Sequence, residues 1–229
     1  MSASHVSVEP AILYFGTPVV LISTTNEDGT FNIAPMSSAF WLGWRCVLGL
    51  GLSSKTPQNL LRTRECVLNL PSVAEVGAVN RLARLTGSNP VPQNKISREY
   101  RYEPKKFETA GLTPMPSETV AAPRALECPV QMEAVLAAHH EIGADSARKG
   151  MIGIFEVRIQ RVHVRPDLLM DGMPNRIDPD KWRPLIMSFQ EFYGLAPGKA
   201  HPSTLGQIAE ALYRSPDVDR AREASRREV

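Results

Sequence analysis

The amino-acid sequence predicts a mainly β fold in which antiparallel strands close into a barrel. Short β-branched and apolar runs recur along the chain, and the first is followed by a turn and a returning strand at hairpin spacing. Long helices of the kind that join parallel strands are scarce. Together these patterns favour an antiparallel barrel over a βαβ sheet.

The first hairpin is predicted between residues 19 and 34. Residues 19–25 (VVLISTT) form a β-branched apolar run that is typical of a buried strand. Asp28-Gly29 supplies the positive φ that a hairpin turn requires, and residues 30–34 return as the partner strand. Pro35 lacks a backbone donor, so we expect the pairing to end there.

A second strand, over residues 46–52, has two distinct faces. Four apolar side chains point one way and three smaller residues the other: Cys46, Leu48, Leu50 and Leu52 against Val47, Gly49 and Gly51. Two glycines on one face indicate either a bulky group close to the backbone or tight packing against a neighbouring element. The sequence leaves both readings open.

Two helices are predicted next. Thr56-Pro57 is typical of a helix start, with a hydroxyl N-cap and proline at the first helical position, and this helix is expected to end near Arg64. Residues 66–71 form another strand. Residues 72–75 (SVAE) are a capping box that opens a second helix running through Leu82.

Residues 86–126 carry few periodic signals and many of the chain's 19 prolines. A connection of this length is uncommon unless it is functional or disordered. It contains Lys105-Lys106-Phe107, which could bring positive charge to a bound anion. Residues 129–136 and 154–164 then alternate as later strands, the second as a half-buried antiparallel strand.

The C-terminal region is predicted to be separate from the barrel. Leu205, Ile208, Ala209 and Leu212 have helical spacing, and the residues beyond Ser215 are mostly charged or small. That end is expected to be a frayed tail or a helix that docks only on a partner subunit. We therefore predict a domain over residues 1–200 and a C-terminal helix and charged tail over residues 201–229.

Composition excludes several classes of protein. The formal net charge of +2 over 229 residues is too balanced for an electrostatic nucleic-acid binder. No apolar run approaches the roughly 20 residues of a membrane span, and the polar N-terminus lacks a signal-peptide core. We therefore expect a soluble, cytoplasmic protein. The odd count of three widely spaced cysteines favours buried thiols over a disulfide framework or a zinc site.

Two hydroxyl-rich loops point to phosphate binding. One precedes a helix start, where free backbone N–H groups and the helix dipole suit an anion, and the other follows a strand that should lie alongside. The candidate residues are Ser53, Ser54, Lys55 and Thr56 in the first loop, and Ser37 and Ser38 in the second. The alternative is an ordinary capped helix with a solvated lysine. No Walker A, Rossmann or nucleophile-elbow motif is present.

The other chemistry-bearing residues are weaker candidates. Adjacent histidines on a strand point to opposite faces, so His139 and His140 are poor partners for one metal, and we predict no metal site. They are expected to lie at the surface, with a role beside a cofactor as the minority reading. His163 is expected to be structural. Trp41 and Trp44 favour core or interface packing over stacking on a planar ring.

The chain resembles the flavin reductase-like family of FMN-binding split-barrel proteins, which includes the flavoredoxins. The likeness spans roughly residues 10–195 and rests on the order and spacing of several segments. These are residues 18–24 (PVVLIST), 28–29 (DG), 32–38 (NIAPMSS), 55–60 (KTPQNL), 67–70 (VLNL), 106–113 (KFETAGLT), 127–130 (ECPV), 153–157 (GIFEV) and 178–184.

The resemblance implies a six-stranded antiparallel Greek-key split barrel with flanking helices. It also implies a homodimer with FMN at the subunit interface, although FAD remains possible, and hydride transfer from NADH or NADPH to the flavin. Phosphate contacts would fall on Ser37, Ser38, Ser53, Lys55 and Thr56. The ring edge and ribityl chain would lie against the backbone of Asn32, Ala34, Pro35 and Met36, near Asn59 and Lys106.

The sequence departs from the family pattern at one turn. Relatives often carry Pro-Pro before the strand that begins here at Cys46, whereas this chain has Gly43-Trp44-Arg45. The departure points to a changed pocket edge and to a different electron donor or acceptor.

Three hypotheses follow. The first is an NAD(P)H-dependent flavin reductase whose reduced flavin passes to a monooxygenase component or another acceptor. The protein then needs to supply orientation and hydrogen bonds rather than an acid–base pair. The second is an FMN-holding electron carrier without its own nicotinamide site. The third keeps the barrel but has no cofactor.

Overall fold

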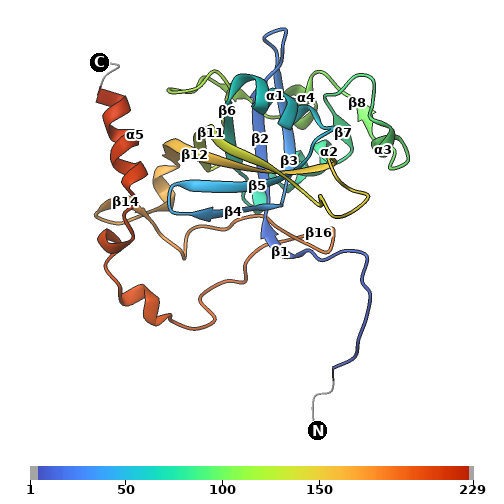
Figure 1. Ribbon diagram of the computed structural model, residues 1–229. Helices are drawn as coiled ribbons and strands as arrows, with labels where there is room; N and C mark the ends of the chain where they lie inside the picture. The colour runs from blue at the N-terminus through green and yellow to red at the C-terminus, as the bar shows by residue number, and fades with distance from the viewer. Residues whose placement is uncertain (1–4, 227–229) are drawn as a thin grey trace.

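A seven-stranded antiparallel sheet forms the centre of the molecule. The structure is a computed structural model that describes residues 5–226. The strands run in the order β3-β2-β6-β11-β12-β5-β4 across the sheet (Figure 1). Their bounds are β2 Val20–Thr25, β3 Phe31–Met36, β4 Ala39–Leu42, β5 Arg45–Gly51, β6 Glu65–Leu70, β11 Val130–Ile142 and β12 Ile152–Val164.

The predicted β class with flanking helices is confirmed, but the predicted six-stranded split barrel has seven strands here, and the sheet does not close into a barrel. The extra strand is β4, which turns back at Ser37-Ser38 and pairs with β5. Within residues 5–226, β3 and β4 are the two edges of the sheet and do not pair with each other. Strands β3 and β4 therefore follow each other in the chain through the Ser37-Ser38 loop, yet they stay unpaired, and the sheet is split between them.

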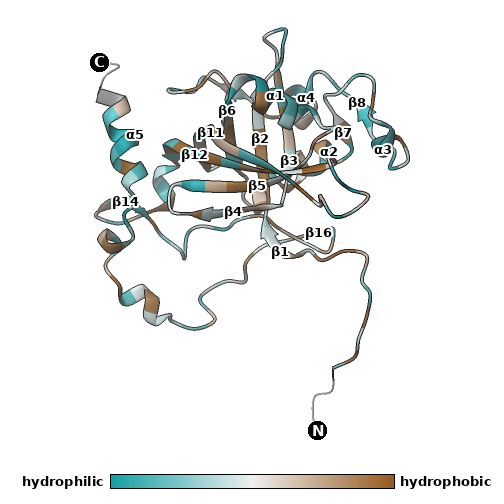
Figure 2. Cartoon of the chain, viewed as in Figure 1, coloured by the Kyte–Doolittle hydropathy of each residue, from teal (hydrophilic) through white to brown (hydrophobic). Residues whose placement is uncertain are grey.

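The main core lies on the inner face of this curved sheet. Alternate side chains of β5 and β12 are buried, as the sequence pattern predicts for half-buried strands. Figure 2 shows the apolar residues concentrated on these central strands. The fully buried members include Val20, Ile22, Cys46, Leu48, Leu60, Cys66, Leu68, Ala134, Phe155 and Val157. Trp41 and Trp44 are half-buried against this core, and all three cysteines are buried and free.

A second core packs the helices α2 (Val76–Leu82) and α4 (Lys106–Ala110) against the other side of β2 and β3. Helix α1 (Lys55–Thr63) covers one end of the sheet near β2 and β3. None of the helices in the described residues is long and apolar enough to cross a membrane.

Local signals predicted the early elements well, with two corrections. Gly29 has a φ of 82°, as the hairpin turn requires, and Ser72 and Glu75 form the predicted capping box. Pairing nevertheless continues past Pro35, because β3 is an edge strand where a missing N–H is tolerated. The N-cap of α1 is Ser54 in an extended conformation, so Thr56 lies inside the helix and is not its cap.

The long connection of residues 86–126 is ordered. It contains β7 (Leu85–Thr86), α3 (Gln93–Ile96), β8 (Arg101–Tyr102), α4, β9 (Pro114–Met115) and β10 (Arg124–Ala125). Polar side chains from the sheet hold its second half in place. The Ser23 hydroxyl donates to the Pro123 carbonyl, and Asn69 Oδ1 accepts from the Ala125 N–H at 2.7 Å.

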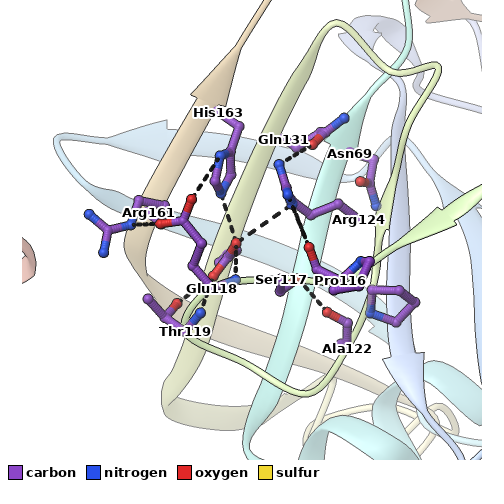
Figure 3. Close-up of polar contacts among 12 residues, drawn as sticks. Asn69, Pro116, Ser117, Glu118, Thr119, Ala122, Arg124, Gln131, Arg161 and His163 are labelled. Atoms are coloured by element: carbon purple, nitrogen blue, oxygen red, sulfur yellow. Dashed lines mark hydrogen bonds and ion pairs between the residues drawn. The ribbon is translucent and has the colours of Figure 1, made fainter. Parts of the chain in front are cut away.

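The strongest of these attachments is the carboxylate of Glu133 on β11, whose side chain has no exposed surface. It accepts from the N–H groups of Glu118 (2.9 Å) and Thr119 (2.6 Å) and lies 2.7 Å from His163 Nε2. Figure 3 shows Glu118, Thr119 and His163 gathered at this network of polar contacts. Burial by itself would raise the pKa of Glu133, but the hydrogen bonds from His163, Thr119 and the backbone lower it to about 2. His163 is structural, as predicted.

Several short elements close the ends of the sheet. Strand β1 (Phe15–Pro18) pairs with β15 (Ile186–Ser188), which pairs with β16 (Glu191–Tyr193). Strands β13 (Leu169–Met170) and β14 (Met173–Ile177) form a small hairpin.

The C-terminal region differs from the prediction. The segment with helical spacing forms two 3-10 turns, Thr204–Gln207 and Glu210–Tyr213, with every residue exposed. Beyond Ser215 the chain forms helix α5 (Pro216–Arg226), which lies against β12 of the same chain and so does not depend on a partner subunit for docking. The helical spacing of Leu205, Ile208, Ala209 and Leu212 predicted an α-helix that does not form. These apolar residues are exposed, so no packing surface stabilises a helix there.

Candidate functional site

The two hydroxyl-rich loops meet at the C-terminal end of β5. The Gly49 N–H donates to the Ser38 carbonyl at 2.8 Å, and a Cβ on Gly49 would lie 3.1 Å from Ser38 Cβ. A Cβ on Gly51 would lie 3.8 Å from Ser54 Oγ. The two glycines of β5 therefore face the two serine loops, and at Gly49 the close neighbour is a packed serine.

The first turn of α1 offers donors to an anion. Ser54 makes no side-chain cap hydrogen bond, and the first turn contains no acidic residue. Lys55 Nζ lies 2.6 Å from the Glu27 carboxylate, whose side chain is 58% exposed. Because Glu27 is largely solvated, an incoming phosphate competes with a weak surface partner for Lys55. Ser53 Oγ contacts Asn94 Oδ1 at 3.4 Å.

A buried polar cluster lies between β3 and α1. Asn32 Nδ2 donates to Thr56 Oγ1 at 3.2 Å and to Thr24 Oγ1 at 3.4 Å. Asn59 Nδ2 donates to Thr24 Oγ1 at 3.0 Å and to Asn26 Oδ1 at 2.8 Å. The predicted residues Asn32 on β3 and Thr56 and Asn59 on α1 are thus brought together, although the two elements are separate in the sequence.

Lys106 reaches this cluster from α4. Its side chain is almost fully buried, 2% of the residue being exposed, and Nζ donates to Asn32 Oδ1 at 3.1 Å. No carboxylate of residues 5–226 lies within ion-pair distance of it. Burial, with a smaller contribution from Lys95, lowers the pKa of Lys106 to about 7. A buried cation without a counter-ion is costly, so this site favours an anionic or strongly polar ligand.

A third hydroxyl loop, missed by sequence reasoning, completes the cluster. Lys95 Nζ donates to Thr86 Oγ1 at 3.3 Å, and burial lowers the pKa of Lys95. Ser88 Oγ is buried without a hydrogen-bond partner within the described residues, as is Asn59 Oδ1. The hydroxyl-rich run at residues 86–88 was the available signal, but nothing in the sequence places it beside Asn32.

Gly87 lines the same space. A Cβ there would lie 2.7 Å from Asn32 Oδ1 and 3.2 Å from Lys55 Cγ. Only glycine therefore leaves the present arrangement of Asn32 and Lys55 undisturbed. The close approach joins the lysine cluster to the loop at the start of α1.

The remaining predicted residues of β3 lie along its free edge. Ala34, Pro35 and Met36 are half-buried, and on the side away from β2 no strand of the described chain pairs with them. A free strand edge offers backbone donors and acceptors to a ligand. This edge runs from Asn32 to the Ser37-Ser38 loop.

The two histidines lie away from the buried cluster. Both are exposed on the distal part of β11, and the His139 ring stacks on Phe155 with centroids 5.9 Å apart. His140 is opposite Ile154, which is opposite Gly49, so all three share one face of the sheet. Two strand spacings, about 10 Å, separate His140 from Gly49. Among the described residues there is no cluster that could hold a metal ion.

The turn at Gly43-Trp44-Arg45 lies at the opposite end of β5 from the serine loops. β5 begins at Arg45 and ends at Gly51, a length of about 20 Å. In this chain the turn contacts the C-terminal helix rather than the polar cluster.

The residues fit a flavin nucleotide. Its phosphate needs hydroxyls, N–H donors and positive charge, which the loops at Ser38 and Ser54 with Lys55 provide. Its polar ring edge and ribityl chain need hydrogen-bonding groups, which the edge of β3, the orphaned Ser88 hydroxyl and the Lys106 ammonium offer.

Comparisons with known proteins agree with this reading. The family model described as "Flavin reductase like domain" matches residues 12–196. The uncharacterized protein YdfE of Bacillus subtilis (strain 168) is 39% identical over 188 residues, which cover 82% of this chain and 88% of the relative.

Solved structures share the fold. Flavoredoxin of Desulfovibrio vulgaris (Miyazaki F) matches with a TM-score of 0.69 at 24% identity, covering 89% of this chain and 100% of that chain. Nitrilotriacetate monooxygenase component B from Bacillus cereus matches with a TM-score of 0.68 at 19% identity, covering 87% and 100%. The family match contains every element of the candidate site. Because this match covers most of the chain, the chain belongs to the flavin reductase-like family.

Proposed function

We propose that this protein is an NAD(P)H:flavin oxidoreductase that binds FMN. The observation that carries the proposal is the buried Lys106, which has Asn32 as its hydrogen-bond partner and no carboxylate of residues 5–226 within ion-pair distance. Such a cation is poorly stabilised until a polar or anionic ligand arrives. Family membership makes a flavin the natural candidate.

The phosphate is assigned to the junction of the serine loops and α1. Ser53, Ser54 and Lys55 form the N-terminus of that helix, and the Ser37-Ser38 loop packs through Ser38 against Gly49 on β5. The helix dipole, the hydroxyls and the lysine each favour a dianion. FMN ends in a phosphate monoester, which can occupy this junction directly. This favours FMN over FAD.

The isoalloxazine ring is assigned to the edge of β3. The backbone of residues 32–36 and the side chains of Asn59, Lys95 and Lys106 would hold its polar edge. When bound, the flavin supplies the hydride acceptor, and NADH or NADPH would be the donor. The contribution of the chain is orientation and charge: Lys106, with a pKa near 7 in the flavin-free protein, is placed to take up a proton as negative charge enters the site.

A second copy of the chain is expected to cover the open side of this site. The polar cluster and the β3 edge lie in one chain, and no strand of residues 5–226 covers the split of the sheet. We therefore propose a homodimer, with a monooxygenase component or another acceptor receiving electrons from the flavin.

The first experiment is the absorbance spectrum of the purified protein, with the released cofactor identified by mass. We expect a yellow protein, or one that becomes yellow with added FMN, that oxidises NADH or NADPH. A colourless protein that binds no flavin and oxidises neither nucleotide would falsify the proposal. Size-exclusion chromatography with light scattering tests the homodimer, and a monomer at micromolar concentration in the presence of FMN rejects it.

Directed variants test the assigned phosphate site. Ser53→Ala combined with Lys55→Ala should weaken FMN binding by at least about tenfold, because a charged hydrogen-bond donor and a hydroxyl are lost. Lys105→Ala is a matched control, since its side chain is 73% exposed and pairs with Glu108 outside the assigned phosphate site. If the double variant binds FMN as tightly as the control does, the phosphate does not bind at Ser53 and Lys55.

The alternative function is an FMN-holding electron carrier, as the likeness to flavoredoxin allows. Such a protein would bind flavin and accept electrons from dithionite or a partner, yet remain oxidised on mixing with NADH and NADPH. Stopped-flow absorbance with both nucleotides separates the two functions.

A further inference from the structure

The C-terminal region after the family match is held by a small number of contacts. The match ends at residue 196, and the linker of residues 194–214 is exposed at every position. Helix α5 then packs against the outer side of β12, away from α1 and α4 (Figure 1). Of residues 215–224, only Asp217 and Ala221 are buried, with Ser215 and Val218 half-buried.

A two-point ion pair anchors this helix. Arg45 Nε lies 2.9 Å from Asp217 Oδ2, and Arg45 Nη2 lies 3.2 Å from Asp217 Oδ1. The third nitrogen, Nη1, lies 2.5 Å from Glu156 Oε1 on β12. The guanidinium thus joins β5, β12 and α5 through a fork geometry that favours carboxylates.

The turn that departs from the family pattern forms the seat for α5. Gly43 has a φ of 59°, and a Cβ there would lie 3.3 Å from Ser215 Cβ. The Gly43-Trp44-Arg45 turn therefore supplies both the space and the charge that receive the start of the helix. The Gly43-Trp44-Arg45 turn and the start of α5 therefore contact each other directly.

The anchor is weak compared with the rest of the fold. An isolated helix of 11 residues is marginal in water, and α5 buries little apolar surface. The ion pair is partly exposed, at 34% for Arg45 and 12% for Asp217, so salt screens part of its attraction. The exposed linker is joined to the rest of the chain by the surface ion pairs Lys199–Asp180 and Arg176–Glu210, neither of which involves a strand of the central sheet. The helix can therefore leave without disturbing that sheet.

We propose that α5 is a releasable latch that opens independently of the barrel when the Arg45–Asp217 pair is broken. Opening uncovers Arg45 together with Arg158, which is opposite it on β12 and has no hydrogen-bond or ion-pair partner in the described part of the chain. The latch controls access to the β5–β12 face that carries Arg45 and Arg158. The proposal does not depend on flavin binding.

Hydrogen–deuterium exchange of the full-length protein tests the latch. At low ionic strength, the amides of residues 218–224 in Asp217→Asn should exchange about tenfold faster than in the wild type, since one charged hydrogen-bonding partner is lost. Wild-type protein in about 0.5 M NaCl should shift in the same direction. The amides of β11 and β12 should not change, and Asp217→Glu should restore part of the protection.

Asp219→Asn is the matched control. It removes the same charge from the same first turn, but Asp219 is exposed and pairs with Arg214 on the linker side. It should leave exchange in α5 within about twofold of wild type. Protection of α5 that is unchanged in Asp217→Asn, or that is lost only together with β11 and β12, overturns the proposal. If Asp217→Asn does not fold, the wild-type salt series decides, because salt-independent protection also overturns it.

Discussion

Replacing Lys106 by methionine is expected to stabilise the flavin-free protein while weakening flavin binding. Methionine has a similar length and no charge, so it removes the buried cation and preserves most of the packing. Wild-type Lys106 is 2% exposed and has Asn32 as its polar contact. In the flavin-free protein, the buried charge of Lys106 therefore lowers the free energy of unfolding. A bound anionic or polar ligand would reduce this penalty.

The magnitude follows from the pKa. A fall from the ordinary 10.5 to about 7 corresponds to roughly 5 kcal/mol of lost stabilisation for the charged form. Methionine leaves Asn32 Oδ1 without its donor, which costs about 1–3 kcal/mol. The net gain for the flavin-free variant at neutral pH is therefore about 2–4 kcal/mol.

The pH dependence has a definite sign. Because the folded pKa lies below the unfolded one, the unfolded chain binds more protons between pH 7 and 10.5, and wild-type stability rises with pH across this window. Lys106→Met should lack that rise. The gain of the variant over wild type should therefore be largest at and below pH 7 and shrink toward pH 10.

Urea unfolding of flavin-free protein at pH 7 and pH 9.5 measures both effects, and fluorescence titration with FMN measures binding. Lys105→Met is the control, since Lys105 is exposed and should change neither quantity. A Lys106→Met protein that is less stable than wild type at pH 7, or that has the same pH slope, would refute the reasoning. If Lys106→Met binds FMN as tightly as the wild type does, Lys106 is not part of the flavin site.

Three further predictions concern other positions. Glu133→Gln should destabilise the protein by roughly 3 kcal/mol at pH 7. Because the folded pKa of Glu133 is about 2, that difference should vanish as pH falls from about 4.5 to 2 in denaturant unfolding. Gly87→Ala should weaken FMN binding by about tenfold or more in fluorescence titrations, because its Cβ would displace Asn32; an unaltered Kd would count against the site. Glu27→Gln should tighten FMN binding a few-fold at low salt, since it frees Lys55, and a weaker complex would show that Glu27 helps to place the lysine.

The sequence by itself determined the elements whose causes are local. The Asp28-Gly29 turn, the capping box at Ser72 and the alternating strand at residues 154–164 all appear as predicted, because each depends on neighbouring residues or on the strand period. The serine loops could also be found, since hydroxyls beside a helix start are visible in the sequence. Whether they bind phosphate remains a prediction.

Only the tertiary structure decided which distant residues meet. Lys106 lies 74 residues from Asn32, and Asp217 lies 172 residues from Arg45. The tolerance of Pro35 depended on β3 being an edge strand, and the role of the Gly43-Trp44-Arg45 turn depended on where α5 packs. A local pattern limits the dihedral angles of a segment, but the path of the intervening chain determines which charges are buried together.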